Sequence, residues 1–585
     1  MNRILLVNFF ITLAVLSFAQ EMGKNIQLNQ LGFYPLANKI AVVTGDIKAT
    51  AFYIISADKK DTVFKGKLSA QRQSKNSSTK TKVADFSSLQ KKGRFTIAVP
   101  GVEDSYIFQI SHLINYPVAI ASLKGFYYQR VSMPLEKQFA GKWARAAGRV
   151  DTAVLIHPSA ASKNKPAGTI ISSSGGWYDA GDYNKYIVNS GITMGTLLSA
   201  YEDFSFYFDT LRTNIPESND AVPDILNEII YNLRWMFTMQ DANDGGVYHK
   251  CTNAAFDGMV MPGVTKEPRY VVQKGTAATL DFGAAMAQAA RIFSKFNTQL
   301  PGLSDSCLKA AEYAWQWAVK NPDLEYDQDA FNKIMQPAIT TGEYGDSKFS
   351  DEWFWAVSEL YITTKQNNYL DALNKESGNA YSLPSWANVG MLGVYSLIRF
   401  EPSLPGASKL IADLKKKVVH FADTLVQNVS TNAFNTVMGR SPKDFVWGSS
   451  AVAANQGITL INAYLITKEK KYIDHALSNL DYLTGWNATG YCFVTGLGSS
   501  SPMHPHHRPS IADGITDPVP GLLSGGPNPG MQDKCKYIFT EPETAFTDDD
   551  CSYASNEIAI NWNAPLVYVA NAIEALQFKV GYSSK

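Results

Sequence analysis

The stretch GGWYDAGDYNKYIVNSG, residues 175–191, joins a turn rich in glycine and aromatic residues to the start of a long helical pattern. From Ile187 to Phe204 the apolar residues recur at helical spacing. Similar segments follow almost to the end of the chain, at 222–240, 276–296, 303–319, 351–364, 383–400, 408–427, 449–467, 471–483 and 557–576. They predict one large all-α domain over residues 116–580. No strict sequence repeat is visible, which favours a closed ring of helix pairs over a solenoid.

The first part of the chain has a different pattern. From Asn25 to Ser111, about seven short runs of β-type residues alternate with turn residues, as in an immunoglobulin-like sandwich. The Cys–Trp–Cys pattern of antibody domains is missing. We therefore predict a small immunoglobulin-like β-sandwich over residues 24–113. Two domains agree with a length of 585 residues, which exceeds what one core usually supports.

Residues 1–19 are predicted to be a secretory signal peptide. Arg3 supplies a basic start, residues 4–16 are apolar, and Ala19 ends a small-residue cleavage site. The apolar run is too short for a membrane anchor, and no later segment has the length that spanning requires. We expect an exported protein, either periplasmic or secreted, with no membrane partner.

The composition narrows the range of ligands. Lys plus Arg and Asp plus Glu both number 53, so the formal net charge is zero, which argues against nucleic acid or anionic lipid as a partner. Aromatic residues are 12% of the chain, which suits either a large core or the binding of neutral sugars. None of the five cysteines forms a CxxC pair, and Cys535 with Cys551 is a candidate disulfide. We expect a monomer.

Two aspartates stand close together in the opening stretch. Asp179 and Asp182 are three positions apart and are flanked by Gly, Trp and Tyr residues. Two carboxylates at this spacing could hold one water molecule and accept its proton. They could also cap the helix that follows, although capping would not explain the aromatic neighbours.

The segment FTDDDCSYASNEIAINWNAPLVY, residues 546–568, holds a second carboxylate group. Glu557 is predicted to open the last helix beside Tyr553 and Trp562, where an apolar setting could raise its pKa as a general acid needs. Helix-end electrostatics is the alternative. The acidic triplet at 548–550 could hold a hard cation such as calcium, but its spacing matches no complete calcium loop.

The segment PMHPHHRPS, residues 502–510, gathers His504, His506, His507 and Arg508. Clustered histidines can bind zinc, yet neither an HExxH nor a CxxC motif accompanies them. The alternative is a set of donors for sugar hydroxyls or a carboxylate, a role that suits Arg508.

With these three groups in place, the chain resembles glycoside hydrolase family nine, the cellulase family, over nearly its whole mature length. The family's water-activating motif is present as DAGD, its histidine motif as PHHR, and its second signature runs from Phe546 to Ala564. The resemblance implies a mainly α fold, an (α/α)6 barrel preceded by the immunoglobulin-like domain. It also implies an inverting hydrolysis of β-1,4-glucosidic bonds in cellulose or related β-glucans.

The resemblance implies a role for each site residue. Glu557 would be the general acid, and Asp182 the general base on water, with Asp179 as its partner. His506 and Arg508 would grip the sugar at the cleavage point. The residues that would contact neighbouring sugar units are His249, Trp447 and Tyr553.

Two positions depart from the family pattern. A zinc site near the start of the barrel is usual in this branch, but Ser132, Gly148 and Arg149 stand where ligands would be expected. We therefore expect no zinc, no other metal at the site and no required cofactor, and structural calcium is left open. Ser500 replaces a basic or amide residue near the histidine motif.

Three other functions are alternatives for this sequence. A related enzyme could act on xyloglucan, mixed-linkage glucan or glucosamine oligomers, because loop lengths decide which polymer enters. A non-catalytic glycan-binding protein would have lost at least one of Asp179, Asp182 and Glu557, and all three are present. A polysaccharide lyase would favour an acidic substrate, which the neutral composition does not suit.

Overall fold

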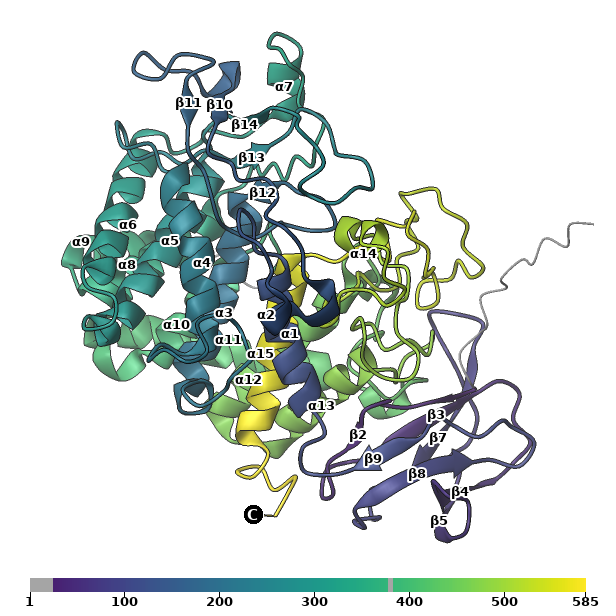
Figure 1. Cartoon of the computed structure of the whole chain (residues 1–585). Coiled ribbons are helices and arrows are strands. Elements are labelled where there is room, and N and C mark those ends of the chain that lie inside the picture. Colours follow the sequence, from purple (N-terminus) through teal and green to yellow (C-terminus); the bar gives the residue numbers. More distant parts are fainter. Residues whose placement is uncertain (1–24, 377–381, 585) are drawn as a thin grey trace, which may run out of the picture.

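The computed structural model describes residues 25–376 and 382–584, and the predicted signal peptide lies outside the described residues (Figure 1). The N-terminal domain is a sandwich of two sheets, as predicted. One sheet has the order β1 (Ile26–Gln27), β3 (Ile40–Thr44), β7 (Lys80–Asp85) and β6 (Arg72–Gln73). The other has the order β2 (Gly32–Phe33), β9 (Phe108–Ile110), β8 (Gly93–Ala98), β4 (Ala51–Ser56) and β5 (Thr62–Lys67). Buried aromatic and aliphatic side chains from both sheets form its core, among them Phe33, Phe52, Ile54 and Phe95.

The second domain is an (α/α)6 barrel, which confirms the predicted fold class. Its inner helices are α3 (Ile187–Phe208), α5 (Thr276–Phe293), α8 (Ser350–Thr364), α10 (Gly390–Arg399), α12 (Ser449–Thr467) and α15 (Ile560–Leu576). Each of the first five packs against the outer helix that follows it, namely α4 (Asp224–Met239), α6 (Leu303–Lys320), α9 (Asn367–Glu376), α11 (Ser408–Val426) and α13 (Lys470–Leu483). The ring closes where α15 packs against α3 and against α1 (Tyr116–Tyr128).

The inner and outer helices differ in how much of their surface is buried. Most side chains of the inner helices are buried all round, whereas the outer helices α6, α9 and α11 bury one stripe and expose polar residues. Small residues let the inner helices approach closely. A Cβ atom on Gly195 of α3 would lie 2.5 Å from the Trp355 ring of α8. Of the helices in the described residues, none is long and apolar enough to cross a membrane.

Two helices begin later than the sequence pattern predicts. Helix α15 begins at Ile560 rather than Glu557, because Ala559 is extended, with φ −150° and ψ 149°. Helix α10 begins at Gly390 rather than residue 383, since Ser385 and Asn388 pair across a turn ahead of it. Local backbone conformation therefore overrides the apolar periodicity at both helix starts.

Long loops and short strands cover one end of the barrel. A small sheet has the order β11 (Ile170–Ile171), β10 (Val154–Ile156), β14 (Arg269–Val271), β13 (Lys250–Thr252) and β12 (Lys185–Tyr186), and the sequence pattern did not predict it. Figure 1 shows this sheet and α7 (Gln328–Asn332) above the start of α3. The short helices α2 (Lys137–Ala140) and α14 (Arg508–Ala512) lie in other connecting segments.

The sandwich is fixed to the barrel by buried polar contacts near β1 and β2. Asn29 Nδ2 donates to the carboxylate of Asp481 at 2.6 Å. Gln30 Oε1 accepts from the N–H groups of Ser499 and Ser500 at 2.7 and 2.8 Å. Buried polar groups that are paired in this way resist separation, because each would otherwise lose its partner.

Candidate active site

Asp179 and Asp182 lie ahead of helix α3 rather than at its N-cap. The N-cap residue of α3 is Tyr186, and no side chain caps this helix. The alternative that the two aspartates serve as helix caps is therefore wrong. The backbone N–H of Asp179 donates instead to the carbonyl of Asn184 at 3.0 Å, which folds the DAGDYN segment into a tight loop.

Polar neighbours orient both carboxylates. Asn189 Nδ2 donates to both oxygens of Asp179, at 2.9 and 3.0 Å, and the Tyr344 hydroxyl lies 3.3 Å from one of them. Asn184 Nδ2 donates to Asp182. Burial, and secondly the charge of Asp182, raise the pKa of Asp179 well above its ordinary value. Asp179 therefore holds a proton at a pH where an exposed aspartate would have lost it.

Glu557 lies next to the loop that carries the two aspartates, and it contacts that loop at Gly181. The N–H of Gly181 donates to Glu557 Oε1 at 3.3 Å, and the N–H of Ile560 donates to the carbonyl of Asp179 at 2.8 Å. Glu557 precedes α15 by three residues, so it is not part of the first turn of that helix. Loss of solvent, and secondly the charge of Asp182, raise the pKa of Glu557 well above its ordinary value. A carboxyl that stays protonated near neutral pH can act as a general acid.

The histidine segment is the third part of the same site. His506 pairs with Glu557 in a parallel bridge, and the N–H of Arg508 donates to the carbonyl of Gly181 at 3.0 Å. A Cβ atom on Gly181 would lie 1.9 Å from the carbonyl oxygen of His506, so only glycine fits between these segments. Asp548 accepts from the backbone N–H groups of Met503 and of His504, at 2.8 and 2.9 Å. All three predicted motifs therefore converge.

The histidine side chains point to different partners. His506 Nδ1 lies 2.6 Å from the carbonyl of Asp550, and the two ring nitrogens of His507 lie 2.8 Å from Ser510 Oγ and 3.1 Å from Gln129 Oε1. Within residues 25–376 and 382–584, no group of three or more His, Cys, Asp or Glu residues is arranged to hold a metal ion.

The other predicted sugar contacts differ in exposure. The rings of Trp447 and Tyr553 lie 5.4 Å apart, and Trp447 is 44% exposed, so this pair is open to a sugar face. His249 is buried, stacks on Tyr326 with ring centres 3.8 Å apart, and contacts the carbonyl of Glu343 at 2.8 Å. Its role as a sugar contact stays a prediction.

Several functional residues were not predicted from the sequence. Asn184 and Asn189 lie inside the opening stretch, where an amide next to two carboxylates was an available signal. Tyr344 comes from the loop ahead of α8 and carried no signal. Lys250 is fully buried, and its Nζ donates to Gln328 Oε1 at 2.7 Å. Burial lowers the pKa of Lys250 to about 7, although the charge of Asp182 acts in the opposite direction.

The positions that replace the expected zinc ligands form hydrogen bonds with other groups. The Ser132 hydroxyl donates to the carbonyl of Arg149 at 3.0 Å, and Arg149 forms an ion pair with Asp257. Near the C-terminus, Cys535 and Cys551 form a disulfide, as the sequence indicated, and the other three cysteines are buried thiols.

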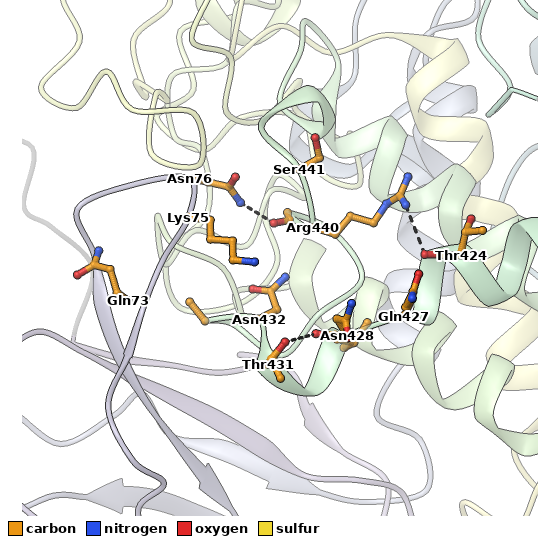
Figure 2. A pocket seen from close by; sticks show the side chains of 13 residues that line it. Gln73, Lys75, Asn76, Thr424, Gln427, Asn428, Thr431, Asn432, Arg440 and Ser441 are labelled. Atoms are coloured by element: carbon orange, nitrogen blue, oxygen red, sulfur yellow. Dashed lines mark hydrogen bonds between the residues drawn. The ribbon is translucent and has the colours of Figure 1, made fainter.

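A separate pocket of about 420 Å³ lies between the two domains (Figure 2). Amide and hydroxyl side chains line much of it, together with Lys75 from the sandwich and Arg440 from the barrel. None of its lining residues is a carboxylic acid or an aromatic residue. It is therefore distinct from the carboxylate site.

Comparisons with known proteins identify the family of the chain and several similar proteins. A family model described as "Glycosyl hydrolase family 9" matches residues 117–570, and one described as "Cellulase N-terminal ig-like domain" matches residues 21–104. The chain is 48% identical over 553 residues to a Bacteroides ovatus protein named "Xyloglucan-specific endo-beta-1,4-glucanase BoGH9A", covering 94% of each chain. It is 31% identical to Endoglucanase D of Acetivibrio thermocellus, covering 94% of this chain and 83% of that protein. A solved structure titled "Bacteroides ovatus GH9" is 46% identical, with a TM-score of 0.89 and coverage of 94% and 99%.

Proposed function

The chain belongs to glycosyl hydrolase family 9 and is a glycoside hydrolase, and on that premise we propose that it cuts β-1,4-glucosidic bonds with inversion at the anomeric carbon. The observation that carries the proposal is the meeting of a proton-holding Glu557 with the Asp179 and Asp182 pair around Gly181. An inverting glycosidase needs one carboxylic acid and one carboxylate on opposite sides of the bond that breaks.

Each carboxyl has one task in the proposed reaction. Glu557 gives its proton to the glycosidic oxygen as the bond to the anomeric carbon breaks. Asp182 accepts a proton from a water molecule, whose oxygen attacks the opposite face of the same carbon. Asp179 keeps its proton and, held by Asn189, fixes the position of that water. Hydrolysis consumes one water, and Asp182 finally passes the gained proton to solvent while Glu557 is reprotonated.

Sugar binding is proposed for the residues around these carboxyls. His506 and Arg508 lie on the segment that pairs with Glu557 and would contact the sugar whose bond is cut. Trp447 and Tyr553 offer an aromatic pair for a neighbouring sugar, because the C–H face of a sugar packs well on a ring. His249 is proposed to contact a neighbouring sugar unit as well.

The polymer itself has two candidates. Cellulose-type β-1,4-glucan is the first, and xyloglucan is the second, because the Bacteroides ovatus relative carries that substrate in its name. The two differ in the xylose branches, which need additional room beside the backbone chain. Product analysis on cellulose oligomers, mixed-linkage glucan, xyloglucan and glucosamine oligomers distinguishes them. We also propose that the protein is exported, acts as a monomer and needs no cofactor.

The stereochemistry of the first product tests the mechanism. Because water attacks opposite the leaving group, hydrolysis of a β-linked oligosaccharide should release the α-anomer first, as followed by proton NMR. The β-anomer should then appear only as fast as mutarotation. The same course is expected in excess EDTA, since no metal takes part in the proposed steps. The β-anomer at the earliest time points would overturn the water-activating role of Asp182.

A further inference from the structure

The guanidinium of Arg508 is held by two backbone carbonyls. Its Nε and Nη2 donate to the carbonyl of Asp257 at 3.0 and 2.9 Å, and its Nη1 donates to the carbonyl of Gly181 at 3.0 Å. The ring centre of Phe256 lies 5.8 Å from its Cζ. Since the N–H of Gly181 donates to Glu557 and its carbonyl accepts from Arg508, this single glycine residue lies between the arginine and the proposed acid.

The carboxylate of Asp257 is held by Arg149 and Thr265. Arg149 Nη2 donates to its two carboxylate oxygens at 2.7 and 2.8 Å, and the Thr265 hydroxyl donates to one of them at 2.7 Å. The side chains of Arg149 and Asp257 are only 4% and 3% exposed. Arg149 Nη1 also donates to the carbonyl of Glu267 at 3.0 Å, so this arginine holds the loop between β13 and β14 at two points.

A buried ion pair is a weak means of stabilising a fold, because removing both charges from water offsets most of their attraction. Its geometry, however, is well defined, since both oxygens of the carboxylate are engaged. The Asp257 side chain and its own carbonyl belong to one residue, so fixing the carboxylate also restricts where the carbonyl points. That carbonyl accepts both the Nε and Nη2 bonds of Arg508.

We propose that Arg149 and Asp257 are positioning residues for the hydrolytic reaction: their ion pair fixes the carbonyl that orients the Arg508 guanidinium beside Gly181 and Glu557. The proposal rests on the proposed roles of Arg508 and Glu557. Neither Arg149 nor Asp257 needs to touch the substrate. They act by holding Arg508 in the one orientation in which its remaining N–H groups and its charge serve the site.

The charge of Arg508 supplies a readout that a structural role would not change. It lowers the pKa of Glu557, against the larger effects of lost solvent and of Asp182 that raise it. The acid must be protonated to work, so activity falls as pH rises through the pKa of Glu557. If Arg508 moves away, that pKa rises, and the basic limb of the kcat against pH profile moves to higher pH. Arg508→Met removes this charge, so it should move the basic limb to higher pH and serves as the reference for the other variants.

Asp257→Asn and Arg149→Gln should lower kcat roughly tenfold or more, because misplacing a group near the reacting atoms is costly. Both should move the basic limb in the same direction as Arg508→Met. Thr265→Val, which removes one hydrogen bond to Asp257, should give a smaller shift of the same sign. Arg149→Lys keeps the charge and should recover part of the activity.

Asp203→Asn is the matched control. Asp203 lies near the far end of α3 and forms an equally buried ion pair with Arg399, at 2.7 Å. Its loss should lower the thermal midpoint without moving the pH limb. If Asp257→Asn and Thr265→Val behave like Asp203→Asn while Glu557→Gln is inactive, the positioning role is wrong. If Glu557→Gln is active, the proposed function fails first. Should Asp257→Asn not fold, the proposal is tested instead by whether Thr265→Val and Arg149→Lys shift the basic limb of the kcat against pH profile.

Discussion

Glu557→Gln is expected to lower turnover on unactivated β-glucan by about 100-fold or more, the usual scale of general acid catalysis. The leaving sugar would depart as an alkoxide, because the amide has no proton to give. The fold should be preserved, since the amide oxygen can still accept from the N–H of Gly181. Steady-state kinetics on cellulose oligomers and circular dichroism of the purified variant measure both effects.

Two comparisons make this result specific. On an aryl glycoside with a very acidic leaving group, the same variant should lose far less activity, because that group needs no protonation. Glu574→Gln is the matched control, since Glu574 is a buried glutamate in α15 that bonds to Tyr34 and lies outside the site. It should retain near wild-type turnover. A Glu557→Gln variant with a tenth or more of wild-type turnover on the oligomers would contradict the acid role.

Asp182→Asn is expected to be as severe, whereas Asp179→Asn should be milder. Asp182 must be a carboxylate in order to accept the proton of water. Asp179 is buried beside that charge and holds its own proton, so an asparagine resembles the form that is already present. Its remaining task, to orient water together with Asn189, survives in part.

The double variant and the pH profile test this division of roles. Because the two aspartates act on one water, Asp179→Asn should add little to the loss already caused by Asp182→Asn. Because the charge of Asp182 raises the pKa of Glu557, Asp182→Asn should also move the basic limb of the profile to lower pH. Equal and small losses in both single variants, with unchanged pH profiles, would show that neither aspartate takes part in the chemistry.

Some features of the protein followed from local sequence. The inner helices carry continuous apolar and small residues, so α12 begins and ends where the pattern predicts, at Ser449 and Thr467. The alternating runs of the first domain predicted the sandwich, because alternation reflects one buried face of a sheet. The motifs DAGD, PHHR and the segment around Glu557 indicated the site and its chemistry, since each contains titratable side chains and matches a motif of the family that the sequence resembles.

Other features depend on contacts between segments that are far apart in the chain. The sequence pattern placed Glu557 in a helix, and the bonds of Ile560 and Gly525 to the site hold it outside one. The short strands β12 to β14 have too few residues to show a period, so pairing alone defines them. Arg149 and Asp257 are 108 positions apart, and no local pattern connects them. The raised pKa of Asp179 also arises in the tertiary structure, because burial and the neighbouring charge of Asp182 cause it, and both exist only after the ring of helices has closed.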